Sequence, residues 1–191
     1  IIGLNGVLWL TSAVCGRNDV EKPSRHVDSP QIADHRPPPR VSILIALYRE
    51  AEVAPLLIQA LRALNYPPEL LDVKLVLEAD DDETGPALLA HNPPPFVEIL
   101  VTPDGGPRTK PRALNFAMEF AKGDIIGVYD AEDRPHPDQI RQIAAQFAAS
   151  PPEVACIQAR LGFYNTSENF ITRCFEIEYS SWFDVMLPGL R

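Results

Sequence analysis

Three carboxylates lie within four positions, directly after an apolar run. The run is Ile125–Tyr129, and the acids are Asp130, Glu132 and Asp133. Such a run predicts a buried strand, and the carboxyl ends of strands form the edge where open α/β sheets bind ligands. Carboxylates repel one another at this spacing unless a cation joins them. The cluster therefore predicts a divalent metal that carries phosphate, and a solvated acidic turn is the alternative.

A basic loop at the start of a predicted helix carries the opposite charge. It contains Arg108, Lys110 and Arg112, and Pro111 suits the first turn of the helix. Cations at a helix N-terminus oppose the helix dipole, so their placement indicates an anionic ligand. Lys and Arg on one side and metal-bound carboxylates on the other are what a diphosphate requires. A solvent-exposed basic loop is the alternative.

Two more loops carry polar side chains just after predicted strands. The first follows Val41–Leu47 and the second follows Val73–Leu77. Their polar residues include Tyr48 and Glu50 in the first loop, and Glu78 and Asp80 in the second. Strand-to-helix loops of a parallel sheet open onto one edge, so we expect all four polar loops to meet there.

Strand and helix patterns alternate along the chain. Further strands are predicted over 97–101 and 154–158, and helices over 53–64, 84–90, 110–121, 140–147 and 167–186. This alternation predicts an α/β fold with a mainly parallel, doubly wound sheet and helices on both faces. The order of the strands does not follow from the pattern.

Composition limits the class of protein. The chain has 191 residues and a formal net charge of -9, which argues against nucleic acid as a partner because phosphate neutralisation needs clustered Lys and Arg. Cys15, Cys156 and Cys174 form neither a disulfide framework nor a metal pattern, which favours a reducing compartment.

The first 40 residues are predicted to lie outside the globular domain, which spans 41–191. Ile1–Val14 is almost wholly apolar but shorter than the roughly 20 residues that span a bilayer. It is either one end of a transmembrane helix or a helix packed on the domain. The Pro-rich stretch Arg17–Arg40 reads as an extended linker.

Taken together, these motifs resemble the family-2 glycosyltransferases, whose nucleotide-sugar-binding domain has the GT-A fold. The resemblance covers roughly Arg40–Arg191. It rests on segments that stand where the family has its functional motifs: Ala46-Leu-Tyr-Arg-Glu50, Glu78-Ala-Asp80, Lys110-Pro-Arg-Ala-Leu-Asn115 and Asp130-Ala-Glu-Asp-Arg-Pro135. Gln158-Ala-Arg160 and Phe175-Glu-Ile-Glu-Tyr179 look closest to membrane-embedded synthases of the cellulose and hyaluronan type.

The resemblance implies a role for each matching residue. Asp130 and Glu132 would hold Mg²⁺ or Mn²⁺, with Asp133 as a further candidate ligand. Glu78 and Asp80 would contact the base and ribose of a nucleotide-diphosphate sugar, with a UDP-sugar favoured. Tyr48 and Glu50 would touch the nucleotide, and Lys110 and Arg112 would lie beside the diphosphate. Asp130 would also contact the donor.

The acceptor would be a growing polysaccharide or another hydroxyl, and the reaction would invert the anomeric centre. The parent protein would be embedded in the plasma membrane with this domain, itself soluble, on the cytoplasmic face. The family's general base is expected beyond Arg191, so no catalytic residue is assigned within the chain, which alone should bind donor but transfer sugar poorly.

Two residues depart from the family pattern: Glu132 replaces an Asp of the metal motif, and Glu78 replaces an Asp of the base-contacting pair. The replacement at Glu78 leaves the base contact open between Glu78 and Asp80. The replacement at Glu132 favours, as an alternative, a non-catalytic module that binds a nucleotide sugar or a partner protein. A nucleotidyltransferase is a weaker alternative, because no Gly-rich loop follows the strand Val41–Leu47.

Overall fold

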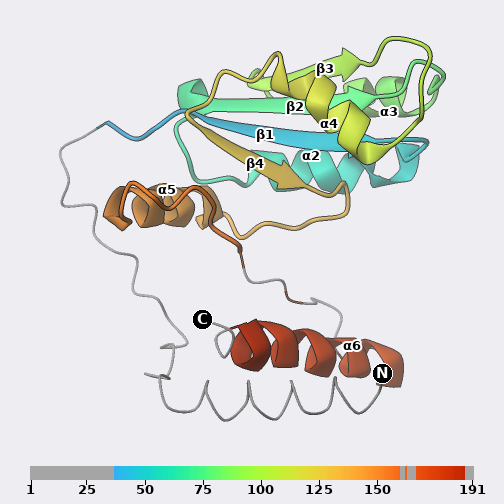
Figure 1. Ribbon diagram of the computed structural model, residues 1–191. Helices are drawn as coiled ribbons and strands as arrows, with labels where there is room; N and C mark the ends of the chain where they lie inside the picture. The colour runs from blue at the N-terminus through green and yellow to red at the C-terminus, as the bar shows by residue number, and fades with distance from the viewer. Residues whose placement is uncertain (1–36, 160–161, 163–166, 188–191) are drawn as a thin grey trace. The chain divides into compact units, whose positions relative to one another are not determined.

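The computed structural model describes residues 37–159, 162 and 167–187 (Figure 1). The expectations for Ile1–Val14 and for most of the linker fall outside these residues. The described residues up to Val154 form one compact unit, and those after it belong to a second, so each unit is treated by itself. A globular domain over 41–191 stays a prediction.

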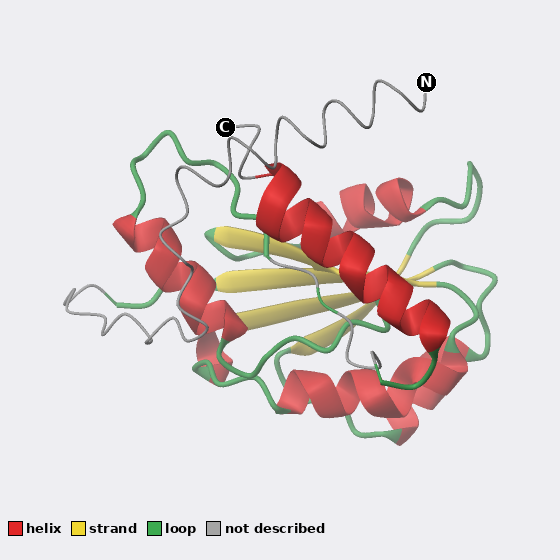
Figure 2. Ribbon diagram, turned by 90° about the horizontal axis from the view of Figure 1, so that it is seen from below, coloured by secondary structure: helices red, strands yellow, loops and turns green. Residues whose placement is uncertain are grey.

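Four parallel strands form the sheet of the first unit, in the order β3-β2-β1-β4. They are β1 (Val41–Leu47), β2 (Leu71–Leu77), β3 (Val97–Val101) and β4 (Ile125–Tyr129). The two central strands, β1 and β2, are buried almost throughout, whereas residues of β3 and β4 alternate in exposure. Figure 2 shows the four strands side by side in yellow.

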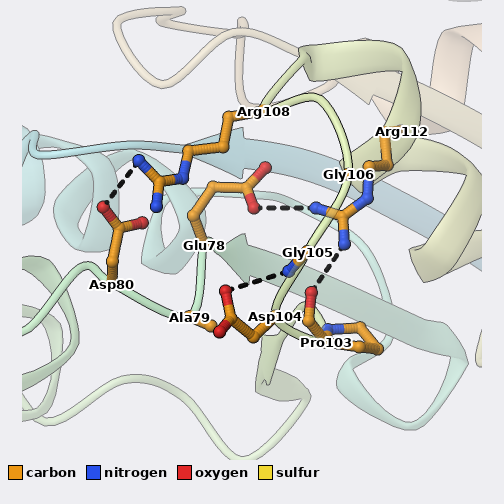
Figure 3. A pocket seen from close by; sticks show the side chains of 9 residues that line it. All are labelled: Glu78, Ala79, Asp80, Pro103, Asp104, Gly105, Gly106, Arg108 and Arg112. Atoms are coloured by element: carbon orange, nitrogen blue, oxygen red, sulfur yellow. Dashed lines mark hydrogen bonds and ion pairs between the residues drawn. The ribbon is translucent and has the colours of Figure 1, made fainter.

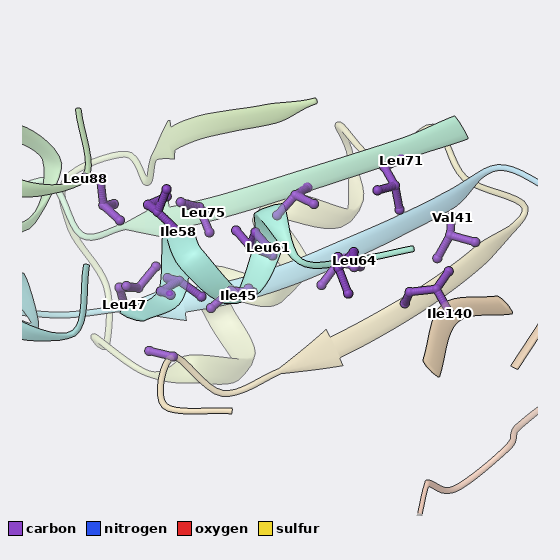
Figure 4. Close-up of a cluster of buried hydrophobic side chains, with 14 of the residues drawn as sticks. Val41, Ile45, Leu47, Ile58, Leu61, Leu64, Leu71, Leu75, Leu88 and Ile140 are labelled. Carbon is purple, nitrogen blue, oxygen red and sulfur yellow. The ribbon is translucent and has the colours of Figure 1, made fainter. Parts of the chain in front are cut away.

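Helices cover both faces of this sheet. The helices are α2 (Ala54–Arg62), α3 (Thr84–Ala90), α4 (Lys110–Met118) and α5 (Gln139–Ala149), with short 3₁₀ turns at Ala51–Val53 (η1) and Pro68–Leu70 (η2). Apolar residues of α2, α3 and α5 pack with one face of β1 and β2 (Figure 4). Ala113 and Ala117 of α4 pack on the opposite face against Leu44, Val76 and Leu100. The predicted α/β doubly wound fold is confirmed.

A buried polar network crosses the face that α4 covers, near the start of the strands. The Ser42 hydroxyl donates to Asp72 at 2.7 Å, and Lys74, which is fully buried, lies 2.9 Å from the same carboxylate. Lys74 also pairs with Glu98. The backbone N–H groups of Lys122 and Gly123 donate to the Ser42 oxygen, so the network ties the segment before β4 to β1 and β2.

Gly123 lies where no side chain fits. A Cβ there would stand 2.3 Å from the Ser42 backbone nitrogen and 2.8 Å from the Val41 carbonyl carbon. We expect Gly123→Ala to lower the free energy of unfolding by about 1–3 kcal/mol, because backbone would have to shift. Gly127→Ala is the control, since its Cβ would make only ordinary contacts. Urea denaturation compares the two variants, and equal losses would contradict this reading of Gly123.

The strand predicted over 154–158 is wrong. The backbone of these residues is irregular, and Val154, Ala155 and Cys156 are exposed. The β-branched and apolar composition of the segment favoured a strand, but a strand forms only where a neighbour takes up its backbone hydrogen bonds.

The second unit contains the helix predicted over 167–186. It consists of α6 (Phe170–Ser181), capped by Asn169, and a π-helical turn at Trp182–Met186 (η3). None of the helices within the described ranges is both long and apolar enough to cross a membrane.

Candidate functional site

Two cavities open at the carboxyl edge of the sheet, and they share two lining residues. The first has a volume of about 280 Å³ and lies between the loops after β2 and β3 (Figure 3). The second has a volume of about 330 Å³ and lies among the loops after β1, β3 and β4. Glu78 and Arg108 line both. The polar loops expected at this edge therefore do meet there.

Each cation of the basic loop pairs with a carboxylate from another loop. The pairs are Arg108 with Asp80 at 3.1 Å, Arg112 with Glu78 at 3.1 Å, and Lys110 with Asp130. Lys110 and Arg112 lie in the first turn of α4, where their charges oppose the helix dipole. The carboxylates offset that cost.

Arg112 is the most firmly held of the three cations. Its guanidinium also donates to the carbonyl of Pro103 at 2.6 Å, and its partner Glu78, which is buried, accepts from the Thr102 hydroxyl at 2.7 Å. Gly106, at φ +82°, approaches the side chain closely, with its would-be Cβ 3.3 Å from Arg112 Nε. Arg112 thus lines the first cavity and not the second, which Lys110 and Asp130 line.

One carboxylate oxygen of Asp80 accepts from several donors, and the other is buried without a partner. Its Oδ2 accepts from the Tyr48 hydroxyl at 3.2 Å and lies 3.7 Å from Arg49, in addition to Arg108. Its Oδ1 is buried, and no hydrogen-bond partner for it is found among the described residues. Buried carboxylate oxygens are rarely left without a donor. The unpaired Oδ1 of Asp80 is therefore an acceptor that a water molecule or a hydrogen-bond donor of a ligand would satisfy.

The loop that carries Tyr48 and Glu50 is held in a strained conformation. Arg49 has φ of 54°, which is uncommon for a residue with a side chain. Its backbone N–H donates to Asp81 at 2.7 Å, and the N–H of Glu50 donates to the buried Thr84 hydroxyl at 3.0 Å. Asp81 and Thr84 therefore join the loop after β1 to the loop after β2 by hydrogen bonds.

We expect Asp81→Ala to lower the free energy of unfolding by about 1–2 kcal/mol, because the variant leaves the N–H groups of Arg49 and Thr84 without their acceptor. Burial raises the pKa of Asp81, but the N–H donors of Thr84 and Arg49 outweigh it and the net pKa is lowered. This contribution to stability is present above the unfolded pKa of about 3.9 and is lost as pH falls through the folded pKa.

Denaturation of Asp81→Ala at neutral pH and near pH 3 tests this, with Asp82→Ala, an exposed neighbour, as the control. The difference between Asp81→Ala and the parent should shrink in acid. A loss of the same size at both pH values would contradict the role of the carboxylate.

The acidic turn after β4 does not bring all of its carboxylates together. Oδ2 of Asp133 accepts the backbone N–H of Asp130 at 2.8 Å, and Asp133 lines neither cavity. Burial and the neighbouring Glu132 raise the pKa of Asp133, partly offset by Lys110. Within the described ranges, no three Asp, Glu, His or Cys side chains converge as a ready metal site. Asp130 and Glu132 line the second cavity.

The second cavity carries excess negative charge. Its lining holds four carboxylates, from Glu50, Glu78, Asp130 and Glu132, against the two cations Arg108 and Lys110. Burial, together with Glu132 and Asp81, raises the pKa of Glu50, while a hydrogen bond from the Tyr48 backbone and the charge of Lys110 oppose the rise. An anion entering such a site would be repelled, whereas Mg²⁺ or Mn²⁺ suits these oxygen ligands. Asp130 and Glu132 could therefore serve a divalent metal that takes its other ligands from phosphate oxygens and water.

Several residues that build the site could not be singled out beforehand. Thr102 and Thr84 act through single hydroxyl bonds to partners distant in sequence, and isolated threonines give no signal. Asp81 is one of four consecutive acids at 80–83, and nothing in their spacing distinguishes it. Arg108 stood in the basic loop, but its position between the two cavities depends on the path of that loop.

Comparison with known proteins identifies the family. The model of glycosyl transferase family 2 matches residues 42–187. Beta-monoglucosyldiacylglycerol synthase of Synechocystis sp. is 31% identical over 139 residues, which cover 72% of this chain and 28% of that protein. Probable glucomannan 4-beta-mannosyltransferase 1 of Arabidopsis thaliana is 31% identical over 158 residues, which cover 77% of this chain and 28% of that protein. The chain thus matches less than a third of either relative's length.

Solved structures show the same fold. The mannosyltransferase PcManGT from Pyrobaculum calidifontis, in complex with GDP-Man and Mn²⁺, gives a TM-score of 0.62 at 24% identity, over 86% of this chain and 48% of that one. Staphylococcus aureus TarS with UDP-GlcNAc gives a TM-score of 0.50 at 18% identity, over 63% of this chain and 37% of that one. The chain belongs to glycosyl transferase family 2 and has the GT-A fold of that family.

Proposed function

We propose that this chain is the donor-binding part of a metal-dependent, inverting glycosyltransferase that uses a nucleotide-diphosphate sugar. The observation that carries the proposal is the pair of adjoining cavities joined by Glu78 and Arg108. One offers a buried carboxylate oxygen that needs a donor, and the other offers carboxylates in excess of cations. A nucleoside joined to a diphosphate has one end suited to each.

The nucleoside would occupy the first cavity. The unpaired Oδ1 of Asp80 would accept from an N–H of the base or a ribose hydroxyl once the side chain turns it toward the cavity, and Arg108 beside it suits a carbonyl oxygen. Tyr48, which lines the second cavity and donates to Asp80, would lie at the edge of the base site. A UDP-sugar remains the favoured donor. The related structures hold GDP-Man and UDP-GlcNAc, so they support a nucleotide sugar without choosing the base.

The diphosphate would lie in the second cavity. Asp130 and Glu132 would hold Mg²⁺ or Mn²⁺, and Asp133 could join them only by giving up its bond to the Asp130 amide. When bound, the metal is a Lewis acid that stabilises the negative charge of the departing nucleoside diphosphate. Lys110 would neutralise the diphosphate from the α4 side, and Arg112 would support it indirectly by fixing Glu78.

The acceptor hydroxyl would attack the anomeric carbon directly. Relatives named for a glucosyldiacylglycerol and for a glucomannan support either a lipid or a polysaccharide acceptor. A parent protein in the plasma membrane, with this domain on its cytoplasmic face, remains part of the proposal.

Titration of the chain with uridine diphosphate, with and without Mn²⁺, tests the proposal by calorimetry. We expect binding that requires Mn²⁺, because the second cavity repels an uncompensated diphosphate. Guanosine diphosphate in a parallel titration reports the base preference. Binding of equal strength without any divalent metal would overturn the proposal.

A further inference from the structure

The ammonium group of Lys110 forms an ion pair with Asp130, the carboxylate on which the metal is expected. Both side chains are about half exposed, at 43% for Lys110 and 54% for Asp130. In the absence of metal, the ammonium group therefore supplies the positive charge at this end of the second cavity. The same ammonium is the group that would contact the diphosphate.

Lys110 is freer to move than Arg112, the other cation in the first turn of α4. Arg112 is fixed by two partners, Glu78 and the Pro103 carbonyl, and its side chain is only 25% exposed. Lys110 carries a compact charge on a flexible four-carbon stem, and an exposed ion pair contributes at most about 1 kcal/mol. A divalent cation can displace it from Asp130 at little cost.

We propose that Lys110 is a placeholder for the metal on Asp130 and is released to the diphosphate when the metal binds; this inference rests on the proposed function. Lys110 then opposes metal binding in the absence of nucleotide and favours nucleotide binding once metal is present. Metal and nucleotide thus strengthen each other's binding by more than the direct contact between them.

Removal of the Lys110 charge should have opposite effects on the two ligands. We expect Lys110→Met to lower the Kd of Mn²⁺ alone by about two- to fivefold, the range of an exposed ion pair. The same variant should weaken binding of uridine diphosphate in the presence of Mn²⁺ by about tenfold, because a charge-assisted hydrogen bond is lost. Lys110→Arg should behave more like the parent on both counts, because it keeps the charge.

The matched control is Arg108→Met, which removes the same charge from the lining of the same cavity while leaving the Lys110–Asp130 pair intact. Free Mn²⁺ is counted by electron paramagnetic resonance, and uridine diphosphate binding is measured by calorimetry, so neither readout depends on turnover. A clearly larger gain in Mn²⁺ affinity for Lys110→Met than for Arg108→Met supports the placeholder.

Equal gains in Mn²⁺ affinity for Lys110→Met and Arg108→Met would overturn the placeholder, because the loss of one positive charge from the cavity would then explain both. No gain in Lys110→Met would overturn it as well. Absence of Mn²⁺ binding in the parent and in every variant, with or without uridine diphosphate, would instead overturn the proposed metal site. The two failures are therefore distinguishable.

Discussion

Asp130→Asn is expected to lower the Mn²⁺-dependent affinity for uridine diphosphate by on the order of 100-fold, at the upper end of the losses seen when even supporting residues of metal sites are changed. The amide keeps the size of the side chain but removes the charge that would hold the metal. It also leaves Lys110 without its ion-pair partner. Calorimetric titration with and without Mn²⁺ measures the effect.

Glu119→Gln is the matched control for this variant. It removes one carboxylate charge at the opposite end of α4, on an exposed residue just after the helix. Affinity near that of the parent is expected. If Asp130→Asn also left Mn²⁺-dependent binding unchanged, a module that binds without this metal site would explain the chain better than the proposed transferase.

Asp72→Ala is expected to lower the free energy of unfolding by about 3–5 kcal/mol, the usual result of removing one partner of a buried ion pair. Lys74 has no exposed surface and would lose its Asp72 partner, and the N–H of Lys122 would lose one of its two acceptors. The Ser42 hydroxyl and the Lys122 backbone N–H both donate to Asp72, and both would then face the space left by its side chain. Urea denaturation measures the loss, and Asp72→Asn provides a milder variant if Asp72→Ala does not fold.

Glu98→Ala is the control, because Glu98 pairs with the same Lys74 from a side chain that is 51% exposed. Its loss should stay below about 1 kcal/mol, as for surface pairs. Equal losses of unfolding free energy in Glu98→Ala and Asp72→Ala would contradict the role of Asp72 as the main partner of Lys74.

The pH dependence of stability is a second test of the stabilising role of Asp72. Burial raises its pKa, but hydrogen bonds from Lys74, Ser42 and the Lys122 backbone outweigh burial, so the net pKa is lowered. A lowered folded pKa means that the stabilisation is present above the unfolded value of about 3.9 and is lost as pH falls through the folded value. Asp72→Asn should therefore show a weaker loss of stability below about pH 4 than the parent.

Much of the fold could be predicted because apolar runs and turn residues report local structure. The strands at 41–47, 97–101 and 125–129 agree with β1, β3 and β4. The second strand was placed two residues late, since Asp72, which pairs with Lys74, looks unsuited to a buried strand when read alone. Their burial is explained by one another and by Ser42, which lies in a different strand. Pairings of this kind depend on strand order, which the pattern does not contain.

The candidate site could be predicted at the level of loops but not of individual pairs. Parallel topology alone brings the polar ends of β1, β2 and β4 to one edge, which explains why Tyr48, Glu78 and Asp130 gather there. The assignment of Arg112 and Lys110 to different cavities depends on the path of the loop through two glycines at positive φ. No spacing rule carries that information.

A crystal structure of the chain grown with Mn²⁺ and a UDP-sugar tests the central claim most directly, because the anomalous signal of manganese locates the metal independently of the refined coordinates. We predict a manganese peak between Asp130 and Glu132, a base within hydrogen-bond distance of Asp80 Oδ1, and Lys110 turned from Asp130 toward the diphosphate. A manganese peak bound to neither Asp130 nor Glu132, or a nucleotide outside both cavities, would contradict the account.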